Sequence, residues 1–196
     1  MRSVVVFEHL TLDGVMQAPG RADEDRRGCF EHGGWATLWD PVIGGVAEES
    51  MASRPTLLFG RRTYEDFYGF WPQQTDNPFT EVLNKSRKYV ASRTLEEPLP
   101  WSNSSLLAGE AAEAVAALKE QPGNDLVVLG SGELVQTLVG LGLVDEFVLL
   151  IHPLILGSGR RLFSDIGARL ALRLVDAKAS PSGVVIATYH REPSDD

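Results

Sequence analysis

The stretch that decides the fold is residues 125–163, DLVVLGSGELVQTLVGLGLVDEFVLLIHPLILGSGRRLF. Its first apolar run is typical of a buried strand and ends at Gly130-Ser131-Gly132, after which the pattern indicates a short helix. Glycine has no Cβ atom, so the backbone N–H groups of residues 132–134 can point at an anion from the start of that helix. A second apolar run, residues 144–151, is expected to return beside the first strand. This order of strand, glycine turn, helix and strand favours a nucleotide ligand.

The composition narrows the class of protein. With 196 residues, 43% of them hydrophobic, the chain is long enough for one sizeable core, so we expect a single domain over residues 1–196. Its net charge of −9, from 18 basic and 27 acidic side chains, would repel a nucleic-acid backbone and an anionic membrane surface. No apolar run reaches the length of a membrane span, and residues 1–7 are too short for a secretory signal. We therefore expect a cytoplasmic protein that binds neither nucleic acid nor membrane.

Strand-like and helix-like segments alternate along the chain. The clearest helix is expected at residues 110–120, where apolar side chains share one face and Pro122-Gly123 stop the helix. Residues 15–34, rich in glycine and charge, predict a long loop over a site. Residues 170–175 and 184–190 predict an antiparallel hairpin, so the sheet is expected to be mixed. Other strands are expected at residues 4–8, 56–59 and 89–92, and helical segments within residues 35–50, 63–68 and 79–84.

Three short segments combine a strand end with small or basic residues: Gly60-Arg61-Arg62-Thr63, Ser92-Arg93-Thr94 and Gly130-Ser131-Gly132. Ligands of open α/β sheets bind beyond the carboxyl ends of the strands, so these segments can converge on one cleft. The arginines supply guanidinium groups, and the glycine turn supplies backbone amides for a pyrophosphate. Together they fit a dinucleotide with an extra phosphate. The alternative is that the arginines are solvated charges and the glycines ordinary turn residues.

These motifs resemble those of the dihydrofolate-reductase-like superfamily, notably LLFGRRTYE at residues 57–65 and KYVASRTL at residues 88–95. The most similar branch is the reductase domain at the C-terminal end of bifunctional riboflavin-biosynthesis proteins, together with its stand-alone bacterial relatives. The TLDG turn at residues 11–14 looks like that branch's Ser-Leu-Asp-Gly element, and residues 142–146 and 156–159 look like its late strand and loop. The resemblance covers nearly the whole chain.

The resemblance implies a single-domain α/β fold, with a mixed sheet of about eight strands flanked by helices, that binds NADPH across the strand ends. It implies contacts to the cofactor's phosphates from Gly60, Arg61, Arg62 and Thr63, and to the adenosine end from Ser92 and Arg93. The pyrophosphate would lie against Gly130, Ser131, Gly132, Glu133 and Leu134.

On the substrate side, the resemblance points to Asp13 as the catalytic residue that orients the substrate or a water near the nicotinamide. Two tryptophans follow the glycine-rich loop, and a planar heterocycle can stack on their rings. The expected substrate contacts are Trp35, Trp39, Asp40, Pro153 and Gly157. The identity of the proton donor stays open among Asp13, Asp40, Glu48 and Glu49.

The chain also departs from the bifunctional proteins. Its single cysteine, Cys29, excludes the zinc deaminase half, which needs Pro-Cys-x-x-Cys ligands. Cys29 and His32 alone offer two metal ligands, so no metal is expected. After Asn77-Pro78 the residues are FTEVL, without the arginine that holds a ribose phosphate in the pathway reductases. The sequence therefore leaves two substrate classes as alternatives: a ribosylaminopyrimidine precursor of riboflavin and a pteridine-like compound.

The sequence thus predicts an NADPH-dependent reductase that delivers hydride to a small heterocyclic, imine or carbonyl substrate. The nicotinamide carries the hydride, which explains why the chain lacks a catalytic triad. The alternative is a non-catalytic NADP-binding protein that has lost its substrate side. A homodimer is expected from the resemblance and from the apolar residues 147–151, which lie close to a hairpin that would otherwise present a sheet edge to water.

Overall fold

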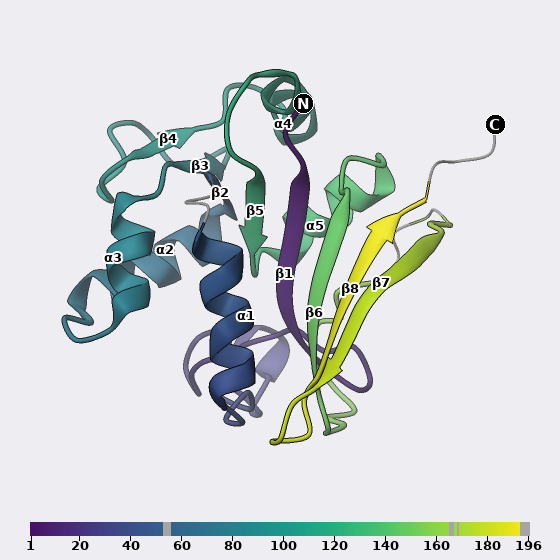
Figure 1. Ribbon diagram of the computed structural model, residues 1–196. Helices are drawn as coiled ribbons and strands as arrows, with labels where there is room; N and C mark the ends of the chain where they lie inside the picture. The colour runs from purple at the N-terminus through teal and green to yellow at the C-terminus, as the bar shows by residue number, and fades with distance from the viewer. Residues whose placement is uncertain (53–55, 165–166, 168, 193–196) are drawn as a thin grey trace.

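The computed structural model describes residues 1–52, 56–164, 167 and 169–192. A single mixed sheet crosses the molecule, with the strand order β4-β3-β2-β5-β1-β6-β8-β7 (Figure 1). Its strands are β1 (Val4–Thr11), β2 (Thr56–Gly60), β3 (Lys88–Ala91), β4 (Ser104–Leu106), β5 (Leu126–Leu129), β6 (Glu146–His152), β7 (Leu172–Ala179) and β8 (Val185–Arg191). The first six strands in the chain pair in parallel, whereas β8 is antiparallel to both β6 and β7. The mixed α/β sheet and the C-terminal hairpin are therefore confirmed.

The N-terminal strand lies at the centre of this sheet. β1 pairs with β5 on one side and with β6 on the other. The expectation that residues 144–151 lie beside residues 125–129 is therefore wrong, since β1 separates these two strands. Apolar side chains on both faces of β1 suit this central position, which is covered on both sides. β1 also runs beyond its predicted end at Glu8, because β6 pairs with it as far as Thr11.

Helices cover both faces of the sheet. One face carries α1 (Pro41–Ala52), α2 (Arg61–Phe70) and α3 (Pro78–Lys85), and the other carries α4 (Ala111–Glu120) and α5 (Gly132–Gly140). In Figure 1, α1 lies in front of the sheet and α5 behind it. Two short 3₁₀ helices, η1 (Arg27–Cys29) and η2 (Trp71–Gln73), lie in the connections.

Local sequence signals explain several helix starts. α3 begins with Pro78 after Asn77, whose side chain accepts a hydrogen bond from the Phe79 N–H at 2.9 Å. α1 begins at Pro41 rather than near residue 35, because the Asp40 carboxylate accepts hydrogen bonds from the N–H groups of the first turn. The clearest predicted helix, at residues 110–120, is observed as α4.

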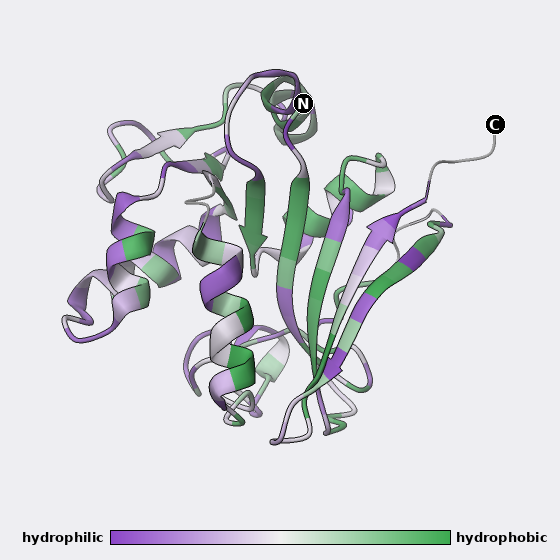
Figure 2. Cartoon of the chain, viewed as in Figure 1, coloured by the Kyte–Doolittle hydropathy of each residue, from purple (hydrophilic) through white to green (hydrophobic). Residues whose placement is uncertain are grey.

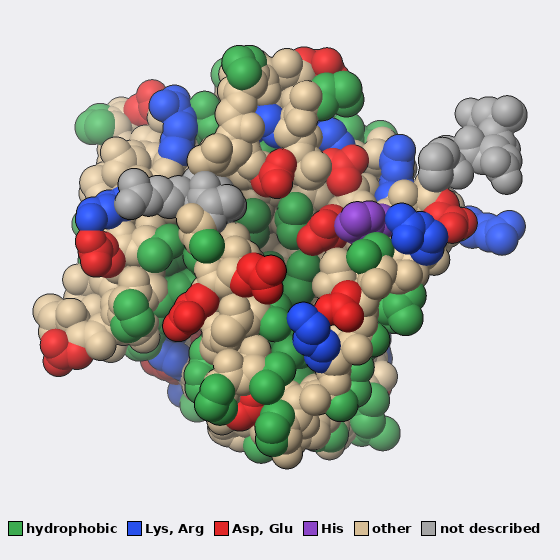
Figure 3. Space-filling view, in the orientation of Figure 1, with side chains coloured by type: hydrophobic (Ala, Val, Ile, Leu, Met, Phe, Trp, Pro, Cys, Tyr) green, Lys and Arg blue, Asp and Glu red, His purple; other side chains and the backbone are tan. Residues whose placement is uncertain are grey.

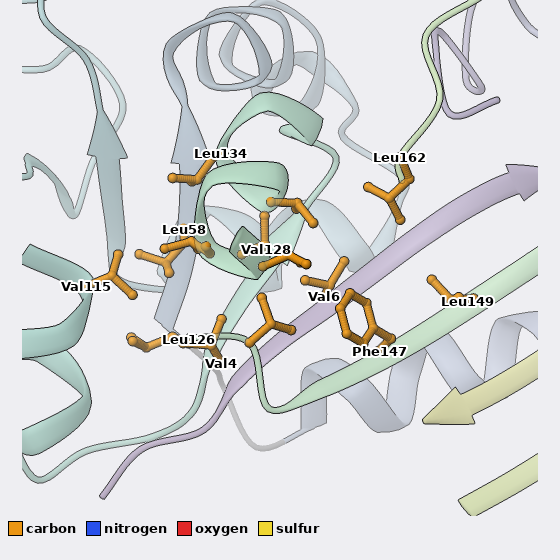
Figure 4. Close-up of a cluster of buried hydrophobic side chains, with 14 of the residues drawn as sticks. Val4, Val6, Leu58, Val115, Leu126, Val128, Leu134, Phe147, Leu149 and Leu162 are labelled. Carbon is orange, nitrogen blue, oxygen red and sulfur yellow. The ribbon is translucent and has the colours of Figure 1, made fainter. Parts of the chain in front are cut away.

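Hydrophobic residues concentrate in β5, β1 and β6 (Figure 2). Their side chains form one core with α4 and α5, where Val6, Val128 and Leu134 lie together (Figure 4). The opposite core contains Ile43 of α1 and Tyr64 of α2, both buried. On the face that carries α1, acidic side chains are interspersed among exposed hydrophobic ones (Figure 3), as expected from the net charge of −9. Both cores hold the ends of β2 and β5 in place, and the candidate site lies at those ends.

Candidate functional site

A large cleft opens at the carboxyl ends of the central parallel strands. Its volume is about 1880 Å³, whereas pockets for one small ligand typically measure about 300–1,000 Å³. The cleft therefore has room for a dinucleotide and a second molecule. The fold brings together here all of the residues predicted to contact the cofactor: Gly60, Arg61, Arg62, Thr63, Ser92, Arg93, Gly130, Ser131, Gly132, Glu133 and Leu134.

Two strand-to-helix turns are joined at the floor of the cleft. The Gly60 N–H donates a hydrogen bond to Ser131 Oγ at 2.9 Å, and the Ser131 N–H donates to Thr63 Oγ1 at 3.1 Å. Ser131 adopts the left-handed conformation, with φ of 58°, which directs the chain from β5 into α5. A Cβ atom at Gly132 would overlap the Met16 sulfur, so a larger residue there would displace the Met16 side chain. These contacts fix the starts of α2 and α5 relative to each other.

Both helix starts suit an anionic ligand. Neither α2 nor α5 has a side-chain hydrogen bond from its N-cap residue. The N–H groups of a helix's first turn lack partners within the helix, and the helix dipole favours negative charge there. A pyrophosphate can accept hydrogen bonds from these groups, so the residues present fit a dinucleotide phosphate.

Three arginines from distant parts of the chain converge on one carboxylate in the cleft. Glu133 Oε1 accepts from Arg27 Nη1 at 3.1 Å, from Arg62 Nη1 at 3.0 Å and from Arg160 Nη1 at 2.7 Å. Although burial alone would raise it, these guanidinium groups lower the pKa of Glu133. The cleft therefore holds, in an acidic protein, the concentration of positive charge that a phosphate needs.

The third strand end contributes Ser92 and Arg93. The Ser92 Oγ accepts hydrogen bonds from the N–H groups of Thr94 and Leu95, which shapes the turn after β3. Arg93 pairs with Glu110 at 3.0 Å, and the Arg93 side chain is 84% exposed. Exposed pairs of this kind are weak, so a phosphate can displace Glu110 from Arg93 at little cost.

Asp13 lies outside the described residues that line the cleft. Its carboxylate accepts hydrogen bonds from Thr11 Oγ1 at 2.6 Å, from the Leu156 N–H at 3.2 Å and from the Gly157 N–H at 2.9 Å. Arg161 also pairs with it at 3.2 Å. The Thr11 hydroxyl in particular lowers the pKa of Asp13 to about 2. In this geometry Asp13 anchors residues 154–161 to the end of β1.

The remaining predicted substrate residues are spread over different environments. Trp39 lines the cleft and is 62% exposed, whereas Trp35 is buried, with its indole N–H donating to the Gln17 carbonyl at 2.7 Å. Asp40 caps α1 and also accepts from the Ser182 N–H at 3.0 Å. Although burial opposes it, hydrogen bonding from Ser182 and α1 lowers the pKa of Asp40 to about 2. Trp35, Asp40, Pro153 and Gly157 do not line the cleft within the described chain.

One part of the cleft is lined by apolar and aromatic side chains of the α1, α2 and α3 region. We call this part the apolar arm; its residues are Met51, Phe67, Phe70, Trp71 and Phe79. Side chains of this kind bind flat, apolar surfaces of ligands. The carboxylate of Glu48 also borders the cleft.

The sequence reasoning missed several titratable residues that also line the cleft, among them Glu8, His9 and Glu24. Burial raises the pKa of Glu8 to about 8, and its Oε2 atom is buried without a hydrogen-bond partner. Burial and the neighbouring His152 lower the pKa of His9 to about 4. A polar pair within a mostly apolar strand, Glu8-His9, was a signal in the sequence for the first two of them.

The sheet and its cleft are those of an α/β domain with room for a ligand at the ends of its central strands. The chain belongs to the RibD C-terminal domain family, whose model matches residues 2–186. It is 33% identical to the uncharacterized protein YyaP of Bacillus subtilis over 198 residues, which covers 96% of this chain and 95% of YyaP. It is 36% identical to YwjB of the same organism, covering 90% of this chain and 91% of YwjB.

Solved structures share the fold. A Shewanella sp. PV-4 protein assigned provisionally to riboflavin biosynthesis superposes with a TM-score of 0.73 at 24% identity, covering 97% of this chain and 99% of that one. A pyrimidine reductase-like protein from Corynebacterium diphtheriae superposes with a TM-score of 0.68 at 13% identity, covering 98% and 93%. The resemblance inferred from the sequence motifs is therefore confirmed.

The described residues lack two kinds of feature. They contain no helix that is both long and apolar enough to cross a membrane. They also contain no group of three or more His, Cys, Asp or Glu side chains that could hold a metal ion.

Proposed function

We propose that this protein is an NADPH-dependent reductase of a small planar heterocycle, imine or carbonyl compound. The observation that supports it best is the meeting of two uncapped helix starts at Ser131, beside the arginines that surround Glu133. A bound dihydronicotinamide would supply the hydride, and water the proton, so that the substrate gains one hydrogen at carbon and one at nitrogen or oxygen.

The chain's own residues would bind and orient the cofactor. The first N–H groups of α5 suit the pyrophosphate, with Arg62 and Arg160 close enough to neutralise its charge. Ser92 and Arg93 suit the 2′-phosphate at the far end of the cleft. This division leaves the apolar arm for the substrate.

The substrate is proposed to be flat and largely uncharged on the side that enters the apolar arm. Aromatic side chains such as Phe67 and Trp71 gain most from a planar ring. Family membership favours a pyrimidine or pteridine ring among such compounds.

Cofactor titration tests the proposal. Trp39 and Trp71 line the cleft, so tryptophan fluorescence should report NADPH and NADH binding. We expect NADPH to bind at least about tenfold more tightly, because a charge-assisted hydrogen bond to the 2′-phosphate is worth about 1.5–3 kcal/mol. NADPH oxidation should then be screened with pteridines, flavin precursors and quinoid compounds. NADPH binding without turnover of any of them would favour the non-catalytic alternative.

We also propose that the protein is a homodimer. β7 is an edge strand with β8 as its partner, and seven of its eight residues are exposed. Leu174 and Val175 on β7 are 52% and 45% exposed, and Val185 on β8 is 42% exposed. An edge strand with exposed apolar side chains is commonly covered, and a second copy of the hairpin suits this edge.

A further inference from the structure

Two histidines that lie 143 residues apart in the chain meet beside the cleft. His9 Nδ1 and His152 Nε2 are 2.9 Å apart, which is a hydrogen-bond distance. The two rings come from neighbouring strands, since β1 and β6 pair from Val5 to Thr11. His152 is completely buried, and the Trp35 ring packs against it at nearly a right angle, with ring centroids 5.3 Å apart. Burial and the contact with Trp35 therefore fix the orientation of the His152 ring.

His9 is the member of the pair that reaches the cleft. It lines the cleft together with Phe7, and their rings meet edge to face with centroids 6.2 Å apart. Phe7 belongs to the core covered by α1, α2 and α3, which is also the side of the apolar arm. His9, two residues along β1 on the same face, therefore brings a polar ring to the cleft on this side of the sheet.

The hydrogen bond between the rings determines where the protons lie. Both imidazoles are neutral near pH 7, because burial lowers the pKa of each. His152 Nδ1 is buried without a partner. A buried N–H without an acceptor is rarer than a buried acceptor without a donor, so His152 is expected to carry its proton on Nε2 and donate it to His9 Nδ1. His9 then carries its own proton on Nε2, for which the described residues supply no acceptor.

We infer that His9 Nε2–H donates a hydrogen bond to the carbonyl oxygen or ring nitrogen of the substrate's reducible group, and that His152 is a positioning residue that fixes this tautomer. The inference rests on the proposed reductase function and narrows its substrates to planar compounds with an acceptor conjugated to the reducible bond. His9 keeps its proton throughout. Its hydrogen bond polarises the acceptor and favours electron density there as the carbon is reduced.

The tautomer is tested first, without any ligand. Nitrogen NMR of the protein labelled with ¹⁵N-histidine distinguishes a protonated ring nitrogen from an unprotonated one. We expect His9 to be protonated at Nε2 and unprotonated at Nδ1. The opposite tautomer would overturn the inference, whatever the protein binds.

Ligand binding is tested next with pteridine-2,4-dione as the probe, in the presence of saturating NADP⁺. The His9→Leu variant should bind the probe about fivefold more weakly, the effect of one neutral hydrogen bond, while its NADP⁺ affinity is unchanged. His32→Leu, in the exposed part of the loop, is the matched control. Equal probe affinity in His9→Leu, or no probe binding to the wild type, would overturn the inference. Failure of the proposed function would show separately, as a wild type that does not bind NADP⁺.

The positioning role of His152 has its own readout. His152→Gln retains an N–H donor close to the Nε2 position, whereas His152→Phe removes it. We expect His9 to stay protonated at Nε2 in the glutamine variant and to become a mixture of tautomers in the phenylalanine variant. An unchanged tautomer in His152→Phe would show that His152 only packs against the core.

Discussion

The Ser131 hydroxyl, at the start of α5, accepts a hydrogen bond from the Gly60 N–H at the end of β2, 2.9 Å away. This bond joins two segments that are 71 residues apart, and both line the cleft. We expect Ser131→Ala to weaken NADPH binding about fivefold, because losing the bond lets the two helix starts separate. Titration by fluorescence, with Ser50→Ala on α1 as the control, measures the effect. Unchanged affinity would mean that the backbone alone holds the two turns together.

Arg93 is predicted to supply selectivity between the two nicotinamide cofactors. Its guanidinium pairs with the exposed Glu110, so a 2′-phosphate can compete for it. Arg93→Ala should weaken NADPH binding roughly tenfold and leave NADH binding almost unchanged, since a charge-assisted hydrogen bond is worth about 1.5–3 kcal/mol. The exposed Arg169→Ala is the control. If Arg93→Ala leaves the ratio of the NADPH and NADH affinities unchanged, then Arg93 does not bind the 2′-phosphate.

Asp13→Asn separates two roles for this residue. Loss of the charge weakens the anchoring of residues 154–161, so we expect a lower melting temperature with NADPH affinity retained. The pKa of Asp13 is lowered to about 2 from 3.8, so its stabilising contribution should be lost as the pH falls from about 4 to 2. Thermal unfolding of the wild type and of Asp13→Asn, at several pH values between about 4 and 2, measures this loss of stability.

The substrate-side role predicted for Asp13 gives the opposite pattern. In that case Asp13→Asn would retain its melting temperature and lose most of kcat with an identified substrate. The contacts of the carboxylate with Leu156, Gly157 and Arg161 favour the anchoring role.

Glu8 is predicted to lower stability as the pH rises from about 4.5 to 8. The folded state raises its pKa from 4.5 to about 8, so it binds a proton that the unfolded chain releases. The stability linked to this proton is complete below about pH 4.5 and is lost as the pH rises to about 8. Glu8→Gln should therefore be more stable than the wild type by roughly 3 kcal/mol at pH 7, with little difference at pH 4.5.

Urea unfolding at several pH values measures this difference. Glu96 is exposed, so Glu96→Gln should be as stable as the wild type at each pH. A stability difference for Glu8→Gln that does not change with pH would mean that Glu8 is ionised in the folded protein.

The homodimer is tested by light scattering at micromolar concentration. We expect about twice the chain mass of 21.4 kDa, and a shift toward monomer when Val175→Lys places a charge on the exposed edge strand. Lys85→Glu, on α3 away from β7, is the control. A wild-type mass near 21.4 kDa would rule out the dimer.

The sequence predicted the parts of this protein whose conformation depends on neighbouring residues. The apolar spacing of α4 and the stop at Pro122-Gly123 are local features, and so is the change from β5 to a helix at Gly130-Ser131-Gly132. All of the residues expected around the cofactor line one cleft, because parallel strands place their carboxyl ends at the same edge of a sheet.

Only the tertiary structure decided which of these parts are neighbours. β1 lies between β5 and β6, and this order depends on hydrogen bonding and burial across the whole chain rather than on any local pattern. The same long-range packing brings His9 to His152 and buries Glu8, and it turns Asp13 toward residues 156–157. Composition and spacing determined the class of fold and the glycine turns at the strand ends, since these rest on local backbone preferences. The substrate side depends on contacts between residues more than a hundred positions apart, which no local preference encodes.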